Sequence, residues 1–229
     1  MFSFLQKYKD LHENESAVIF GSGPSLNSYD RSLIPEKNVI FVGVNSLIFN
    51  DSLELDYYFC ADDFEKRYEE GHPNRSFPLT QLEQIKSKSP ALKTFCVTKI
   101  HGGAHEAVNI LFTSQEMADV RATSIEISTL SGAENFQKDI TLKPMYNHSI
   151  AFPALQFLLY VGVKKIYLVG FDAGGKHSYF CEDKEWEDNQ VWNWVEFRDF
   201  KNDKYPDVEI VSVNPRNLKG LFLSEIYNE

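Results

Sequence analysis

The sequence predicts an α/β fold in which a mostly parallel, Rossmann-like sheet carries helices on both faces. Apolar runs typical of buried strands recur along the chain and alternate with segments of helical spacing. Such alternation implies right-handed crossovers, which give parallel strands covered on both sides. The 229 residues, 43% of them hydrophobic, suffice for one sizeable core. No repeat, linker or low-complexity stretch divides the chain, so we expect a single domain over 1–229.

The predicted strands are short apolar runs that end in small or polar residues. They cover 17–20, 38–45, 56–60, 93–98, 166–172 and 208–213. The run at 124–128 alternates polar and apolar positions, as an exposed or edge strand does. Helices are predicted over 3–12, 64–70, 79–88, 105–119 and 150–160. The last of these tolerates Pro153 because it falls in the first turn.

Composition excludes several classes of partner. A net charge of −10 disfavours general affinity for nucleic acid or an anionic membrane. Cys60, Cys96 and Cys181 match neither a zinc site nor a redox pair, which indicates a reducing compartment. No apolar run approaches the roughly 20 residues that span a bilayer. We therefore expect a cytoplasmic protein without a transmembrane segment; peripheral membrane association and a homo-oligomer stay open.

A glycine turn follows the first predicted strand. Gly21, Ser22, Gly23, Pro24 and Ser25 stand where a buried strand of an α/β sheet hands over to a helix. Glycines there let backbone approach a ligand, and free N–H groups suit a phosphate. The turn lacks the third glycine of a dinucleotide fingerprint and the Lys-Ser/Thr pair of a Walker loop. The alternative is a tight strand-to-helix turn without a ligand.

Polar residues follow three further strands, and topology is expected to bring them to the same edge as the glycine turn. Asn45 offers a donor and an acceptor to a base or sugar, and Asp172 can accept from ribose hydroxyls. Asp62 and Asp63 follow the third strand, where one of them could hold a divalent cation. Each is also a common turn residue, and Asp172 as a plain turn former is an equal alternative. Their recurrence favours a nucleotide crevice.

The loop after Asp172 carries the predicted general base. His177 lies between glycines and a polar stretch, where an imidazole can activate a hydroxyl near neutral pH. A solvated loop histidine is the alternative. Ser149 is expected to cap the helix over 150–160. Residues 176–205 are interpreted as a lid or acceptor segment, although Trp186, Trp194 and Phe197 have the helical spacing of core packing.

The motif order resembles a known family. Gly21–Leu26 after the first strand, Asn45 after the second, Ser149 before a helix, Lys164–Asp172 and Val213-Asn214-Pro215 together cover about half the chain. This pattern is similar to the bacterial CMP-sialic-acid-dependent sialyltransferases. It is also similar to the broader set that shares their nucleotide-binding core, including motility accessory factors and hydroxymethylpterin pyrophosphokinases.

The resemblance implies a GT-A-like fold and a role for each matching residue. Gly21–Ser25 would surround the nucleotide phosphate, while Asn45, Ser149 and Asp172 would contact cytidine. His177 would be the base because no other histidine follows Asp172. Tyr179 would replace one of two family tyrosines on the leaving phosphate. Asp62, counted here with the nucleotide-binding residues, stands where sialyltransferases carry an amide, and the family's arginine before Ser149 is missing.

The leading hypothesis is a glycosyltransferase that moves sialic acid or a related nonulosonic acid from a CMP-activated donor to a glycan or protein hydroxyl. Its partners would be the nucleotide sugar and the acceptor, and it would use no cofactor or metal. One alternative is a Mg²⁺-dependent pyrophosphokinase that acts on a pterin-like alcohol through Asp62 or Asp63. The other is a non-catalytic nucleotide-binding module.

Overall fold

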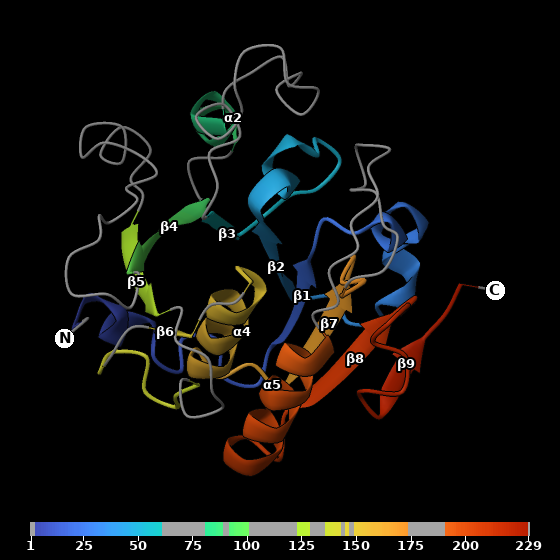
Figure 1. Ribbon diagram of the computed structural model, residues 1–229. Coiled ribbons are helices and arrows are strands. Elements are labelled where there is room, and N and C mark those ends of the chain that lie inside the picture. The colour runs from blue at the N-terminus through green and yellow to red at the C-terminus, as the bar shows by residue number, and fades with distance from the viewer. Residues whose placement is uncertain are drawn as a thin grey trace.

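The computed structural model describes residues 3–60, 81–88, 92–100, 123–128, 136–142, 145–146, 149–173 and 191–228. The strands of this part are β1 Ser16–Phe20, β2 Val39–Val44, β3 Tyr57–Cys60, β4 Lys93–Ile100, β5 Thr123–Ser128, β6 Met145–Tyr146, β7 Lys165–Val169, β8 Glu209–Val213 and β9 Ser224–Ile226. They form one sheet in the order β6-β5-β4-β3-β2-β1-β7-β8-β9, and all neighbours are parallel (Figure 1). The predicted parallel α/β sheet is confirmed.

Every apolar run that predicted a strand lies in this sheet. The central strand β1 shows why, since Ala17 to Phe20 are all at most 1% exposed. A strand buried on both faces needs apolar residues at every position, so it reads as a continuous hydrophobic run. The alternating run at 124–128 is β5, the last strand but one, which pairs with the two-residue β6 through Ile127 and Ser128.

Helices cover both faces of the sheet, as predicted. On one face lie α4 (Ala151–Tyr160), α5 (Val191–Lys204) and the 3₁₀ helix η1 (Ser3–Tyr8). Their buried side chains share one core cluster with β1 to β3, in which Phe157 packs 5.0 Å from Phe95 between ring centroids. The predicted helix over 3–12 is therefore the shorter η1.

The opposite face is covered by short elements. The 3₁₀ helices η2 (Pro24–Ser28), η3 (Arg31–Leu33) and η4 (Asn45–Phe49) bring Leu26, Ile34 and Leu47 close to this side. Leu26, Ile34 and Leu47 pack with Val18 and Phe20, the side chains of β1 that point away from α4. The helix α2 (Gln81–Ser87) adds Ile85 beside β3. Of these elements, η4 begins directly after β2, and η2 follows β1 after Gly21, Ser22 and Gly23, which positions the candidate site.

Within the described ranges, no helix is both long and apolar enough to cross a membrane. The predicted helices over 64–70 and 105–119 lie outside those ranges.

Candidate nucleotide site

The residues that follow β1, β2, β7 and β8 meet at one edge of the sheet. The strands are parallel, and their last residues are in register. Phe20 of β1 pairs with Gly43 of β2 and with Val169 of β7, and Val169 pairs with Val213 of β8. The chain after each strand therefore leaves the sheet on the same side. The convergence of the glycine turn with the ends of β2 and β7 is as the sequence predicts, and the segment after β8 joins them.

The two glycines of the turn are needed for contact within the protein itself. The Gly21 N–H donates to Val169 O at 2.7 Å, and the Gly23 N–H donates to Gly170 O at 2.8 Å. A Cβ on Gly21 would lie 2.6 Å from Gly170 O, and one on Gly23 would lie 2.3 Å from Asp172 Oδ2. The absence of side chains thus allows the turn to pack on the end of β7, as the alternative of a tight strand-to-helix turn predicts; close approach of a ligand stays a prediction.

Asp172 closes the turn from the other side. Its Oδ2 accepts a hydrogen bond from the Ser25 N–H at 3.0 Å, and its residue surface is 4% exposed. Its Oδ1 is also buried and accepts no hydrogen bond from the part of the chain that the structure describes. The nearest cation is Arg216, whose Nε lies 3.6 Å from Oδ1. Asp172 is therefore a turn-forming residue that keeps one carboxylate oxygen for a further donor.

Few N–H groups of the turn remain for an anion. Besides Gly21, Gly23 and Ser25, the Leu26 N–H is also used, donating to Gly23 O at 3.0 Å. Pro24 has no N–H. Among the described residues of the turn, only the Ser22 N–H makes no hydrogen bond to other described residues. Backbone donors alone therefore give a weaker phosphate site than the sequence suggests.

Left-handed backbone gathers at this edge of the sheet. Asn45 (φ 45°), Ala173 (φ 52°) and Asn214 (φ 48°) follow β2, β7 and β8, and Gly170 (φ 73°) follows β7 directly. Non-glycine residues adopt such angles at a cost and concentrate at functional sites when they do. Asn45 is held in place by its carbonyl, which accepts the Tyr58 hydroxyl at 2.6 Å.

Ser149 lies at the same edge on the α4 face. The far end of α4 is tied to the segment before β1, where the Asp10 N–H donates to Tyr160 O at 3.2 Å. The helix therefore runs against the strands and begins near their carboxyl ends. Ser149 Oγ accepts a long hydrogen bond of 3.4 Å from the Ala151 N–H, but the N-cap residue of α4 is Ile150 and no side chain caps the helix there, so the predicted cap at Ser149 is not formed. The structure gives no hydrogen bond between Ser149 and the glycine turn.

Three predicted site residues, Asp62, His177 and Tyr179, lie outside the described residues, as does Asp63. Their roles stay predictions. Of the segment 176–205, the structure describes the part from 191, which includes α5. Trp194 there is 2% exposed and packs 5.3 Å from Phe171 between ring centroids, so it belongs to the core. Within the described ranges, no group of three His, Cys, Asp or Glu side chains could hold a metal ion.

Sequence reasoning missed the segment after β8. Asn214 Nδ2 donates to Ser28 O at 3.3 Å, and Asn228 Nδ2 donates to the same oxygen. The Asn228 N–H donates to Asn214 Oδ1 at 2.9 Å. These bonds hold the end of η2 while Arg216 stands beside Asp172. Asn214-Pro215 at a strand end was a visible signal, but it did not identify Arg216.

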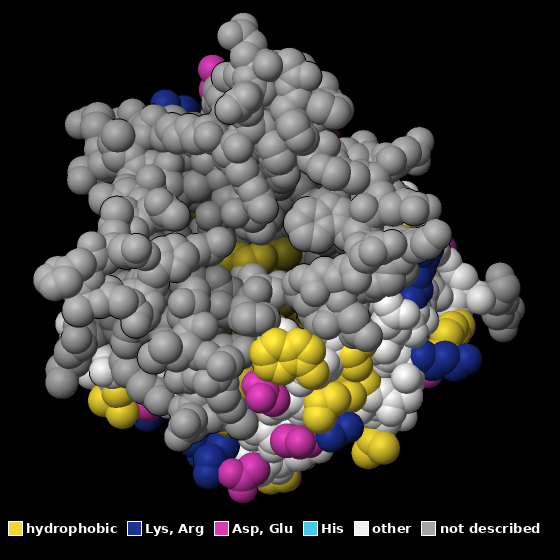
Figure 2. Space-filling model, in the orientation of Figure 1, with side chains coloured by type: hydrophobic (Ala, Val, Ile, Leu, Met, Phe, Trp, Pro, Cys, Tyr) yellow, Lys and Arg dark blue, Asp and Glu magenta, His cyan; other side chains and the backbone are white. Residues whose placement is uncertain are grey.

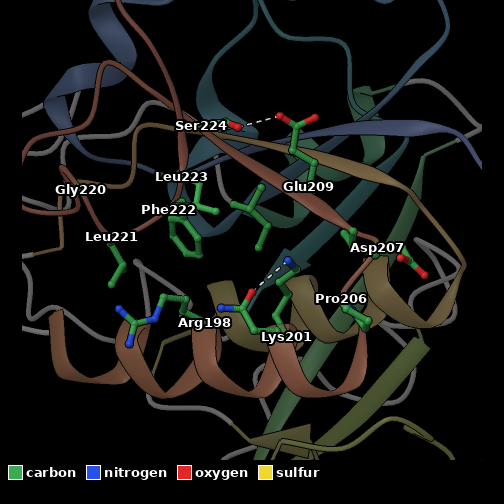
Figure 3. A pocket seen from close by; sticks show the side chains of 13 residues that line it. Arg198, Lys201, Pro206, Asp207, Glu209, Gly220, Leu221, Phe222, Leu223 and Ser224 are labelled. Atoms are coloured by element: carbon green, nitrogen blue, oxygen red, sulfur yellow. Dashed lines mark hydrogen bonds between the residues drawn. The ribbon is translucent and has the colours of Figure 1, made fainter.

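A cavity of about 490 Å³ lies elsewhere, between α5 and the β8–β9 end of the sheet. Figure 3 shows Arg198 and Lys201 rising from α5 toward Leu221 and Phe222. Lys201 Nζ is 3.1 Å from Asn202 Oδ1, and burial lowers the pKa of this lysine. The surface over this end mixes hydrophobic, basic and acidic side chains (Figure 2).

This cavity is separate from the candidate nucleotide site. Glu209, which lines it, is the first residue of β8 and so lies at the amino edge of the sheet. Its carboxylate accepts the Ser224 hydroxyl at 2.7 Å and lies 3.3 Å from Lys165 Nζ, the first residue of β7. The glycine turn and Asp172 lie at the carboxyl edge.

Of the comparisons with known proteins, the one with solved structures bears on the fold. No family model matches the chain, and no curated protein does. Among solved structures it is similar to the sialyltransferase CstII from Campylobacter jejuni in complex with cytidine-5′-monophosphate, with 16% identity, a TM-score of 0.50, and coverage of 87% of this chain and 80% of that one. Cst-I, a monofunctional α-2,3-sialyltransferase of the same organism, gives 15% identity, a TM-score of 0.49 and coverage of 87% and 75%. The chain shares the α/β fold of CstII, as the motif order predicts.

Proposed function

We propose that this chain is a glycosyltransferase that transfers sialic acid or a related nonulosonic acid from a CMP-activated donor to a hydroxyl of a glycan or protein. The observation that carries the proposal is Asp172 Oδ1 beside the glycine turn, a buried oxygen that accepts no hydrogen bond from the described residues and has Arg216 Nε 3.6 Å away. A buried carboxylate oxygen without a hydrogen bond is costly unless a ligand donates to it. The CstII fold, solved with CMP bound, supports a cytidine nucleotide as that ligand.

In this proposal the nucleotide lies across the carboxyl edge of the sheet. Its phosphate faces Gly21–Ser25, and its cytidine meets Asn45, Ser149 and Oδ1 of Asp172. Asp62 remains a proposed neighbour of the nucleotide. The left-handed residues at this edge support the assignment, because strained backbone of this kind gathers where ligands bind.

The proposed reaction is a displacement at the anomeric carbon. His177 takes the proton of the acceptor hydroxyl, whose oxygen forms the new bond to the anomeric carbon. The bond from that carbon to the phosphate oxygen breaks, and CMP leaves with the electron pair while Tyr179 contacts its phosphate. Orientation of donor and acceptor supplies much of the rate, and the base contributes about 10²–10⁴-fold. No cofactor or metal takes part.

The test is release of CMP from CMP-sialic acid by purified protein, with lactose or a sialylated glycan as acceptor. The reaction should be unaffected by EDTA, and His177→Ala should lower kcat by about 10²-fold or more. Asp172→Ala should raise KM for the donor, whereas Asp199→Ala, an exposed carboxylate on α5, should change neither value. Binding of CMP without turnover would favour the non-catalytic module. Turnover of ATP that depends on Mg²⁺ would favour the pyrophosphokinase.

A further inference from the structure

The segment that follows β8 brings a cation to the glycine turn. Asn214 holds Ser28 at the end of η2, and two residues later Arg216 Nε stands 3.6 Å from Asp172 Oδ1. Asp172 in turn holds Ser25 through its other oxygen. Arg216 is thus separated from the turn by one side chain, although it lies far from the turn in sequence.

The guanidinium of Arg216 is available to a ligand. Its contact with Asp172 is longer than a hydrogen bond, and 46% of its side chain is exposed. Within the described part of the chain, no side-chain hydrogen bond of Arg216 is formed. A guanidinium has five N–H donors in a fixed fork that matches phosphate and carboxylate oxygens. Exposure lets this side chain move, and its donors remain to be satisfied.

An anion at the glycine turn needs such a group. Four of the N–H groups around the turn are already used within the protein, which leaves the Ser22 N–H. The same anion would face the buried carboxylate of Asp172, and like charges at short range repel. A cation between the anion and the carboxylate of Asp172 removes this repulsion and replaces the missing N–H donors. Arg216 lies beside that carboxylate, where its guanidinium can serve as this cation.

We infer that Arg216 receives the phosphate of the nucleotide at an anion subsite formed with Ser22 and the glycine turn. This inference rests on the proposed function for the identity of the nucleotide, but not for the presence of an anion. The alternative is that Arg216 only neutralises Asp172. The inference and this alternative make different predictions for binding. If Arg216 receives an anion, its loss weakens the binding of a charged ligand more than the binding of a neutral one.

Calorimetric titration of the wild type, Arg216→Gln and Arg216→Lys with CMP and with cytidine tests the inference. Loss of a charge-assisted bond should weaken CMP binding about tenfold or more in Arg216→Gln. Cytidine, which lacks the phosphate, should bind all variants alike. Arg216→Lys should keep part of the CMP affinity, because it keeps the charge and loses the fork. The control is Arg198→Gln, which removes an arginine of α5 paired with its neighbour Asp199.

The outcomes separate the inference from the proposed function. Equal CMP affinity in the wild type and Arg216→Gln overturns the inference, as does an equal loss of CMP and cytidine. Titration of the wild type and Arg216→Gln with AMP, GMP and UMP tests whether the site selects the cytosine base. If these bind the wild type as well as CMP does and depend on Arg216, the anion subsite stands and the CMP-dependent function fails. No binding of any nucleotide overturns both.

Discussion

Replacement of Gly23 by alanine measures how closely the glycine turn is packed on the end of β7. Gly23 has φ −70° and ψ 155°, angles that alanine adopts freely, so the backbone itself adds no strain. The new Cβ would lie 2.3 Å from Asp172 Oδ2 and 2.7 Å from Gly170 O. Neither oxygen moves at low cost, because each accepts a hydrogen bond from the turn.

The expected loss of stability follows from these contacts. Overpacking of this kind costs about 1–3 kcal/mol, and a weakened hydrogen bond to a carboxylate adds about 1.5–3 kcal/mol. We expect a decrease of about 3 kcal/mol in the free energy of unfolding, which corresponds to a fall in Tm of roughly 6–12 °C for a domain of this size. Urea and thermal unfolding followed by circular dichroism measure both values.

The matched control is Gly220→Ala. Gly220 has φ 76°, and a Cβ there would meet nothing within 4 Å, so the cost is backbone strain of about 1 kcal/mol. Gly23→Ala should therefore be the more damaging substitution even though its backbone angles are ordinary. If Gly23→Ala unfolds at the wild-type temperature, or is milder than Gly220→Ala, the close packing of the turn on Asp172 is refuted.

Three further changes probe charge and burial. Asp172→Ala should lower the stability to urea by about 2 kcal/mol because the Ser25 N–H loses its acceptor, while Asp172→Asn, which keeps a side-chain oxygen, should lose less. Burial raises the pKa of Tyr205 to about 12. The unfolded tyrosine ionises near pH 10, so the free energy of unfolding should fall as the pH rises from 10 to about 12. In Tyr205→Phe the free energy of unfolding, measured in urea at alkaline pH, should depend less on pH. Burial disfavours the charged form of Lys201, so Lys201→Met should keep or raise the Tm at pH 7, and a loss larger than that of the exposed-site control Lys204→Met would contradict this.

The sheet could be predicted because each of its longer strands leaves a recognisable pattern in its own stretch of sequence. A strand buried on both faces must be apolar throughout, so β1 and β7 stand out in the sequence. The glycine turn could also be located, since glycines at a strand end mark a sharp change of direction. The strands β6 and β9 could not, because segments of two and three residues leave no periodic pattern.

The geometry of the site depends on contacts that no local pattern records. The partner of Gly23 is Asp172, and the partner of Asp172 is Arg216, with long stretches of chain between them. The sequence therefore left both the glycines and Asp172 divided between a tight turn and a ligand contact. In the structure one oxygen of Asp172 forms the turn, and the other, beside Arg216, accepts no hydrogen bond from the described residues.

The order of the sheet has a consequence during synthesis of the chain. β1 obtains its first neighbour, β2, soon after it is made, but its second neighbour is β7, which begins at Lys165. Until then one backbone edge of β1, whose last four residues are apolar, has no partner, a condition that favours aggregation and chaperone binding. The glycine turn shares this delay, because Asp172 is made after β7. A nascent chain therefore completes the glycine turn and its contact with Asp172 only after β7 has paired with β1.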